Sequence, residues 1–327
     1  MMKFGFYPLI LRSFLFMDIP RKKIDEYKFI REIGRGGFGS IYEIEDIITH
    51  KHFACKVENR DIVFSTLGRE AIIMNHLPDK PCFGKVYEFI SDEYGEYLII
   101  ELLGPSLDTM RNQFFHSRFT YGTAIRLAIQ MLSAIKELHI FGYIHCDIKP
   151  SNFLLRPGNS QYVTLIDFGL SSHYYTQNGD HIVQNYFCPN FQGTPLFCSP
   201  NAHLFSSLSR RDDLYSWFYS LIQILSGKLP WEHYSFPLMY DRKMKYLPSI
   251  LGKQYSKHLE NIGKYIETMT FSETPNYSWM EKQLYFVLDD HDIFPTTPFN
   301  WEKFGKTKIL KFSPIADLPI AKSLDNL

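Results

Sequence analysis

Several features that would each assign this chain to a special class of protein are missing from its 327 residues. The five cysteines are odd in number and include no C-x-x-C pair, so neither a disulfide framework nor a zinc site is indicated. We therefore expect free thiols in a reducing, intracellular compartment, cytoplasmic or nuclear. No apolar run is long enough to span a bilayer, and no internal repeat or low-complexity linker is present.

An excess of charge of either sign is also missing. The 35 Lys and Arg residues balance 35 Asp and Glu residues. This balance removes the broad electrostatic attraction that would favour nucleic acid or a membrane surface, so we expect neither as a partner. Charged residues make up only 21% of the chain and apolar residues 45%, a composition that argues against wholesale disorder and allows a sizeable core.

The N-terminal stretch MMKFGFYPLILRSFLFM contains a lysine followed by a short apolar run, which is compatible with a weak signal peptide. However, Pro8 and Arg12 interrupt the run, and no small-residue cleavage site follows it. We favour the alternative, in which residues 1–26 are an extension outside the fold and Met17 is a possible working start.

The chain changes character at about residue 104. Before it, YKFIREIG, SIYEIED and HFACKVE read as strands, STLGREAIIMNHL as a helix, and GKVYEFI and EYLIIELL as strands. After it, residues 120–142 are apolar nearly all round and predict a buried helix, and RRDDLYSWFYSLIQILSG has helical spacing. The pattern predicts an α+β fold with a strand-rich part over 27–101, a mainly helical part over 105–304 and a tail over 305–327.

The glycine-rich segment GRGGFG over 34–39, followed by Ser40 and Ile41, matches G-x-G-x-x-G-x-V. In a dinucleotide-binding unit the same glycines open a helix, whereas here they precede a strand pattern. The strand favours a hairpin that covers phosphates, with glycine allowing a close approach of the backbone. An ordinary glycine-rich turn is an equally good reading of this segment taken alone.

Phe53-Ala54-Cys55-Lys56 on the third strand resembles V-A-I-K. A lysine there reaches the α- and β-phosphates of a nucleotide and needs an acidic partner, for which Glu70 on the next helix is the candidate. A lone strand lysine is more often solvated, but the position of Lys56 after the glycine-rich segment reverses that expectation.

His145-Cys146-Asp147-Ile148-Lys149-Pro150-Ser151-Asn152 matches H-x-D-x-x-x-x-N and is the strongest signal in the sequence. In this motif Asp147 accepts or orients the proton of an attacking hydroxyl, Lys149 neutralises phosphoryl charge and Asn152 ligates magnesium. The same residue types also occur in surface turns. The buried helix before the loop and the next motif after it weigh against a turn.

Asp167-Phe168-Gly169 follows an apolar strand, and Asp167 is the main candidate ligand for magnesium. Both Asn152 and Asp167 supply oxygen donors, which a hard cation requires. The triplet alone is common by chance. Four motifs in this order, each on the appropriate element, are typical of protein kinases.

At these residues the chain resembles the eukaryotic protein kinase family over about 27–304, and within it the casein kinase 1 group, closest to the tau-tubulin kinase-like branch. The strings that carry the resemblance are ELLGPSLD, SPNAH and SRRDDLYSWFYSLIQILSGKLPW. It implies a two-lobed kinase fold with a small β-rich N-lobe over 27–101 and a larger helical C-lobe over 105–304. It also implies ATP and Mg²⁺ as cofactors, Ser or Thr of protein substrates as acceptors, and a monomer.

The resemblance further implies a salt bridge between Lys56 and Glu70, hydrogen bonds from Thr194 to Asp147 and Lys149, and anchoring of the catalytic loop by Asp213. It places Ile100 at the gatekeeper position. The full set that it implies for nucleotide binding is Ile33, Gly34, Arg35, Gly36, Gly37, Phe38, Gly39, Ile41, Ala54, Lys56, Ile100, Glu101, Leu103, Leu154 and Ile166.

Two positions depart from the family pattern. Cys146 replaces the usual Arg of H-R-D, so the enzyme is expected to be active without phosphorylation of its activation loop. We read Cys146 as an inert small residue rather than a redox site, because the neighbouring carboxylate disfavours thiolate. Leu196 stands where the group has an Arg that reads phosphorylated substrates, and four nearby basic residues offer a substitute: Arg210, Arg211, Lys243 and Lys245.

Two other functions remain open. A pseudokinase, acting as a scaffold or ATP-binding module, would lack part of the catalytic set, yet all of Lys56, Glu70, Asp147, Asn152 and Asp167 are present. A small-molecule kinase of similar fold is disfavoured by Lys149 and by the long segment that ends in Gly193-Thr194.

Overall fold

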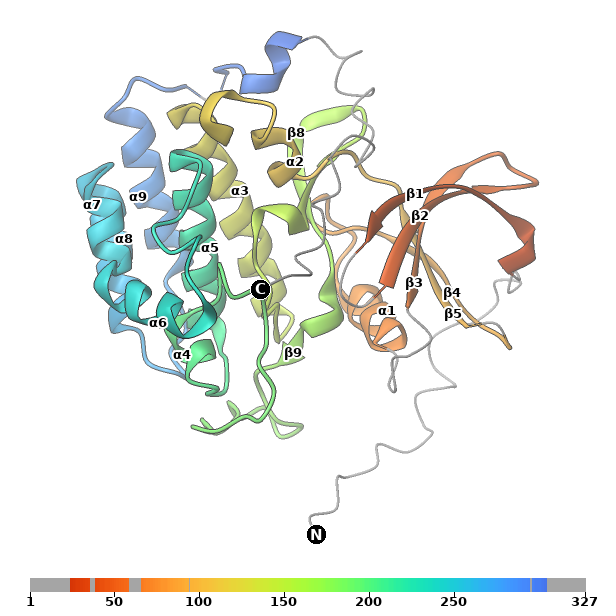
Figure 1. The fold of residues 1–327 in the computed structure, drawn as a ribbon, viewed down its shortest axis with the longest axis horizontal. Helices are drawn as coiled ribbons and strands as arrows, with labels where there is room; N and C mark the ends of the chain where they lie inside the picture. The colour runs from red at the N-terminus through yellow and green to blue at the C-terminus, as the bar shows by residue number, and fades with distance from the viewer. Residues whose placement is uncertain (1–23, 36–38, 59–65, 94, 295, 305–327) are drawn as a thin grey trace, which may run out of the picture. The chain divides into compact units, whose positions relative to one another are not determined.

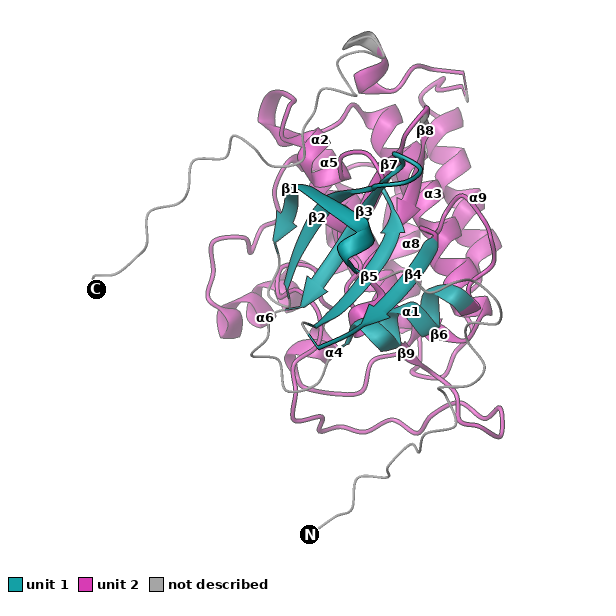
Figure 2. Ribbon diagram, turned by 90° about the vertical axis from the view of Figure 1, so that its right-hand side faces the viewer, with its two compact units in different colours: residues 1–75, 86–102 teal, residues 76–85, 103–327 magenta. Residues whose placement is uncertain are grey.

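The computed structural model describes residues 24–35, 39–58, 66–93, 95–294 and 296–304 (Figure 1). The chain divides into two compact units (Figure 2). Unit 1 comprises residues 1–75 and 86–102, and unit 2 comprises residues 76–85 and 103–327. The N-terminal extension and the C-terminal tail expected from the sequence lie almost wholly outside the described residues.

Unit 1 is built on one antiparallel sheet of five strands in the order β1-β2-β3-β5-β4. The short 3₁₀ helix η2 (Ile24–Glu26) precedes the sheet, and helix α1 (Leu67–His76) lies between the third and fourth strands in sequence. The strands are β1 (Tyr27–Arg35), β2 (Gly39–Asp46), β3 (His52–Glu58), β4 (Val86–Ser91) and β5 (Glu96–Glu101).

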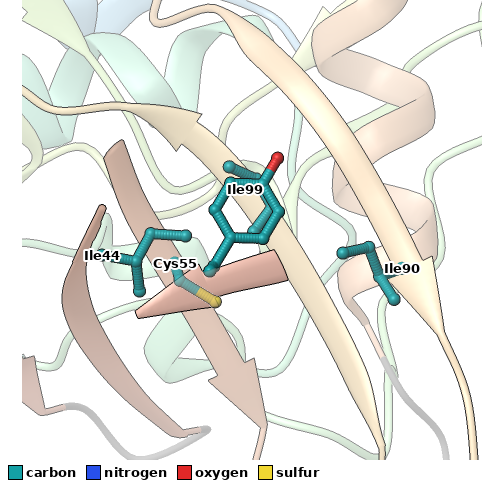
Figure 3. Close-up of a cluster of buried hydrophobic side chains, with 5 residues drawn as sticks. Ile44, Cys55, Ile90 and Ile99 are labelled. Atoms are coloured by element: carbon teal, nitrogen blue, oxygen red, sulfur yellow. The ribbon is translucent and has the colours of Figure 1, made fainter. Parts of the chain in front are cut away.

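The two faces of this sheet carry different side chains because successive residues of a strand point to opposite sides. One face holds a buried apolar cluster of Tyr27, Ile44, Cys55, Ile90 and Ile99, and Figure 3 shows this cluster with the last four labelled. Residues one position away, such as Ala54 and Lys56, must therefore face the other side.

Unit 2 is mainly helical (Figure 1). The indole Nε1 of Trp217 donates to the carbonyl oxygen of Ala128 at 3.0 Å, tying α5 to α3 in the apolar core. No helix in the described part of the chain is both long and apolar enough to cross a bilayer. The helices are α2 (Leu107–Arg111), α3 (Tyr121–Ile140), α4 (Pro200–His203), α5 (Arg210–Ser226), α6 (Phe236–Lys245), α7 (Pro248–Lys253), α8 (Lys257–Thr268) and α9 (Tyr277–Asp289).

Two short antiparallel pairs and several single turns complete unit 2. The segment from about residue 174 to 199 is largely irregular. The pairs are β6 (Tyr143–Ile144) with β9 (Ser172–His173), and β7 (Phe153–Arg156) with β8 (Asn159–Leu165). The turns are the 3₁₀ helices η3 (Phe115–Ser117), η4 (Pro150–Asn152), η5 (Phe168–Leu170) and η6 (Asn300–Phe304).

Helix α5 begins and ends at defined signals. Ser209 and Asp212 form a reciprocal capping box at its start, and Gly227 ends it with a φ of +88°. A Cβ at Gly227 would lie 2.0 Å from the carbonyl oxygen of His116, so glycine is required there both for conformation and for space.

We predict that Gly227→Ala destabilises the protein more than Gly158→Ala does. Both glycines have positive φ, but a Cβ at Gly158 would meet nothing within 4 Å. Gly158→Ala should cost about 1–2 kcal/mol for conformation alone, and Gly227→Ala about 2–4 kcal/mol because the carbonyl must also move. Thermal unfolding of both variants measures the difference, and equal midpoints would show that the close approach to His116 is not a constraint.

Candidate active site

The face of the unit 1 sheet that does not carry the apolar cluster holds a buried ion pair. Lys56 Nζ lies 2.7 Å from Glu70 Oε2, joining β3 to α1. The Glu70 side chain is 1% exposed, so its charge depends on this partner. The pairing predicted between these residues is present in the structure.

Strand register places the remaining residues of this face. Ile41 pairs with Lys56, and Ala54 pairs with Ile100, so the four side chains share the side of the sheet on which Lys56 meets α1. Glu101 ends β5; the family resemblance implies that its backbone groups, rather than its side chain, bond the adenine.

The glycine-rich segment is only partly described, because Gly36, Gly37 and Phe38 lie outside the described residues. Ile33 lies at an irregularity in the β1–β2 register, and Arg35 pairs with Ser40 and forms an exposed ion pair with Glu32.

The two described glycines of the segment differ. A Cβ at Gly39 would lie 2.0 Å from the carbonyl oxygen of Val57, so the sheet itself requires glycine there. A Cβ at Gly34 would make only ordinary contacts, the nearest being 3.6 Å from Ile41 Cδ1. Packing against the described residues therefore does not require glycine at position 34, and a ligand that approaches the backbone would.

In unit 2 one buried carboxylate anchors the loop over residues 145–152, which we call the catalytic-type loop. Asp213 accepts hydrogen bonds from the backbone N–H of His145 at 2.7 Å and of Cys146 at 2.9 Å. Its Oδ2 also lies 2.9 Å from Nε2 of His139, whose pKa is lowered by burial. Neutral His139 thus donates from Nε2 and accepts at Nδ1 from the hydroxyl of Tyr277, 2.5 Å away.

Asp147, Lys149 and Thr194 form a closed triangle of hydrogen bonds. Lys149 Nζ lies 2.7 Å from Asp147 Oδ2 and 2.9 Å from Thr194 Oγ1. Because the lysine occupies the Thr194 oxygen as a donor, the Thr194 hydroxyl donates its own proton to Asp147 Oδ1 at 2.7 Å. A residue 45 positions along the chain from Lys149 is thereby held against the catalytic-type loop.

Asn152 and Asp167 are the two metal ligands predicted for this unit. Asn152 Nδ2 donates to the carbonyl oxygen of Asp147 at 2.9 Å, which fixes the amide so that its oxygen points away from that contact. The backbone N–H of Ile166 donates to the Asn152 carbonyl at 3.0 Å, and His145 Nε2 lies 3.0 Å from the Ile166 carbonyl. These bonds bring the two predicted metal ligands onto neighbouring, mutually braced segments.

Two residues of the site have a left-handed backbone conformation. Cys146 has a φ of +66° and Asp167 a φ of +69°, in the left-handed region that non-glycine residues seldom adopt. Such residues persist where the surrounding contacts over-determine them, and they cluster at functional sites.

The other residues expected to contact a nucleotide in unit 2 lie along β7. Leu154 bridges Ser106, and the N–H of Gly104, one residue after Leu103, donates to the carbonyl oxygen of Leu155 at 2.8 Å. Leu103 is therefore held next to β7.

Cys146, one of the two residues that depart from the family pattern, lies in an apolar environment. Cys146 is buried in a cluster with Ile144, Cys198, Ala202 and Leu208, and its Sγ lies 3.8 Å from Ser172 Oγ. This environment is that of a small packed residue.

Three of the four basic residues that could replace the missing Arg at Leu196 are engaged in internal contacts. Arg210 donates to the carbonyl oxygen of Ser272 and stacks on Tyr174, and Arg211 donates to the carbonyl oxygen of Met269. Lys243 is fully buried, and only Lys245 is exposed.

Sequence reasoning did not single out His139 or Tyr277, and it named Lys243 only as a possible substitute for the charge missing at Leu196. Their local sequences carry no chemical motif, and each acts through a contact with a distant segment. The buried helix that the sequence predicts over 120–142 contains His139, but nothing in its pattern marks that residue.

The fold and this site define a protein kinase: the chain belongs to the protein kinase family, whose profile, described as "Protein kinase domain", matches residues 27–276. This membership confirms the predicted two-lobed α+β kinase fold.

Three known protein kinases are among the proteins similar to this chain. The chain is 32% identical over 280 residues to a probable serine/threonine-protein kinase of Dictyostelium discoideum, covering 84% of this chain and 56% of that one. It is 32% identical over 296 residues to casein kinase I homolog 2 of Saccharomyces cerevisiae, covering 85% and 53%, and 31% identical over 293 residues to homolog 1, covering 85% and 54%. It thus spans little more than half the length of each.

Proposed function

We propose that the protein transfers the γ-phosphoryl group of ATP to Ser or Thr of protein substrates, as a casein kinase 1-like enzyme of the tau-tubulin kinase-like branch. The triangle of Asp147, Lys149 and Thr194 carries this proposal, because hydrogen bonds hold a carboxylate, an ammonium and a hydroxyl in one fixed arrangement. The named serine/threonine kinase and casein kinase relatives support it.

The residues present fit ATP with Mg²⁺. The described residues around Gly34 would tolerate a Cβ there, so its glycine leaves room for a ligand beside the backbone. The Lys56 side chain is oriented by the buried carboxylate of Glu70. Asn152 and Asp167 would hold the metal, and no group of three or more His, Cys, Asp or Glu residues able to bind an ion occurs among the described residues. A two-donor site suits Mg²⁺, which keeps waters and binds substrate phosphates. Bound Mg²⁺ would offset phosphate charge.

The chain's own groups supply the rest. Asp147 Oδ2 and Oδ1 are the atoms that would orient the acceptor hydroxyl and take its proton. Lys149 holds Asp147 in place and carries positive charge toward the transferred group. Thr194 keeps the end of the activation segment against this pair.

The pseudokinase and small-molecule kinase alternatives receive less support. A pseudokinase gains nothing from a braced carboxylate–lysine–hydroxyl triangle, and the triangle includes Thr194 from a long segment suited to a protein substrate. We further propose a monomeric, intracellular enzyme with a domain over 27–304 and no nucleic acid or membrane partner. The balanced charge supports the last point.

We predict that Asp147→Asn and Lys56→Met each lower kcat about a hundredfold or more. Because these groups act as a unit, the double variant should be little worse than the worse single variant. The rate of phosphate incorporation into casein measures the loss of kcat. Incorporation into an aminoglycoside or choline instead of casein would favour the small-molecule kinase. Asp289→Asn, an exposed carboxylate on α9, is the matched control. Normal turnover in Asp167→Asn with magnesium would refute the assigned metal ligands.

We predict activity without phosphorylation of the activation segment. Cys146 carries no charge to pair with a phosphate, and the segment is tied by other bonds. Asn185 N–H donates to Ser207 Oγ at 3.0 Å, and Ser207 N–H donates to the Asn185 carbonyl at 2.8 Å. Protein phosphatase treatment should leave kcat/KM unchanged. A large loss that rephosphorylation restores would contradict this.

We predict weak discrimination for phosphorylated substrates. A charge-assisted hydrogen bond is worth about 1.5–3 kcal/mol, so replacing the group's Arg by Leu196 costs roughly tenfold or more in preference. Two peptides that differ only by a phosphoserine three residues before the target should have kcat/KM values within about tenfold. A much larger ratio would contradict the prediction. Leu196→Arg should raise the ratio if the rest of the pocket exists.

A further inference from the structure

Lys243 on α6 is a fully buried lysine whose donors are all used. Its Nζ lies 2.6 Å from the carbonyl oxygen of Cys198, 2.7 Å from that of Pro195 and 3.1 Å from Nε2 of His203. An ammonium has three N–H donors, and these three are its nearest acceptors; the Sγ of Cys198 lies farther off, at 3.6 Å. Burial of an ammonium is costly without such saturation, so the contacts are strongly constrained.

The third acceptor fixes the state of His203. Burial and the charge of Lys243 lower the pKa of His203 to about 4, so the imidazole is neutral. Its Nε2 therefore presents a lone pair to the ammonium, and its proton is on Nδ1. The rings of Tyr219 and Trp231 lie 5.4 and 5.5 Å from Nζ and add cation–π attraction.

Trp231 holds the carbonyl that Lys243 does not reach. Its Nε1 donates to the carbonyl oxygen of Leu196 at 2.8 Å. We call residues 195–198 the anchored turn, since the carbonyls of Pro195, Leu196 and Cys198 are all bound by side chains of the unit 2 core.

Hydrogen bonds connect the anchored turn to Thr194, and Thr194 to Asp147. The N–H groups of Phe197 and Cys198 donate to the carbonyl oxygen of Thr194 at 2.9 and 3.0 Å. The Thr194 hydroxyl then donates to Asp147. A continuous path of hydrogen bonds therefore runs from Lys243 to Asp147.

We propose that Lys243 and Trp231 are positioning residues that hold the anchored turn, and through it Thr194 and the substrate-facing end of the activation segment, in one geometry. This inference rests on the proposed kinase function. It also gives Lys243 a role other than anion binding: its ammonium is committed to neutral acceptors inside the protein, so it does not replace the charge absent at Leu196.

The first test uses Lys243→Met and Trp231→Phe, with Trp217→Phe as the matched control. Trp217 is also fully buried and donates to a backbone carbonyl, but that of Ala128 in α3. The two anchor variants should lower kcat/KM for a peptide about tenfold, with the KM for ATP within about twofold. The control should lose stability but keep its peptide kinetics. Unchanged peptide kcat/KM in both anchor variants would overturn the proposal.

The second test is the pH profile. Burial lowers the pKa of Lys243 to about 8, whereas burial raises those of Cys198 and Tyr219, and His203 stays neutral. Above about pH 8 a neutral amine keeps two N–H donors for three acceptors, so the wild-type peptide KM should rise there. Trp231→Phe should keep this rise and Lys243→Met should lose it. The same rise in Lys243→Met would contradict the role of the ammonium.

A third measurement needs no activity. Hydrogen exchange at the Phe197 and Cys198 amides should be faster in both anchor variants and unchanged in Trp217→Phe. If the wild type transfers no phosphate, the proposed function fails while this readout still tests the anchors. If Lys243→Met does not fold, Trp231→Phe decides: exchange matching that of Trp217→Phe would overturn the proposal.

Discussion

The buried carboxylate of Asp213 is the interaction on which the rest of the site depends. It is 2% exposed and receives three donors, two from the backbone at His145 and Cys146 and one from His139. An unsaturated buried carboxylate is expensive, so these contacts oppose any movement of the loop. They also account for the left-handed backbone at Cys146, because two hydrogen bonds at that residue and its neighbour offset its conformational cost.

The same principle recurs outward from Asp213. Two residues of the catalytic-type loop show it: Asp147 is matched to Lys149 and Thr194, and Asn152 to the Asp147 carbonyl. Positions are thus set by saturation of buried donors and acceptors rather than by apolar packing alone. Such networks favour one geometry, since moving one member leaves another unpaired.

Much of this was accessible from the sequence because it rests on local patterns. Alternation along β3 separates Ala54 and Lys56 from Cys55, and motif order places Asp147 and Asn152 on one loop. The pairing of Lys56 with Glu70 followed from the family spacing. The distinction between Gly34 and Gly39 did not, because it depends on the backbone of β3, which only the folded sheet brings to within 2.0 Å of a Cβ at Gly39.

Lys243 shows why the rest was not accessible. Four basic residues near the site look alike in the sequence, and burial of one of them depends on acceptors 40 to 48 residues away. The distinction has a functional consequence. An arginine that pairs with a phosphate orders a segment only after modification, whereas an ammonium enclosed by neutral acceptors orders its segment as soon as the chain folds. We therefore propose that the absence of an arginine at Cys146 and the saturation of Lys243 belong to one arrangement, in which internal hydrogen bonds take the place of a charge supplied by phosphorylation.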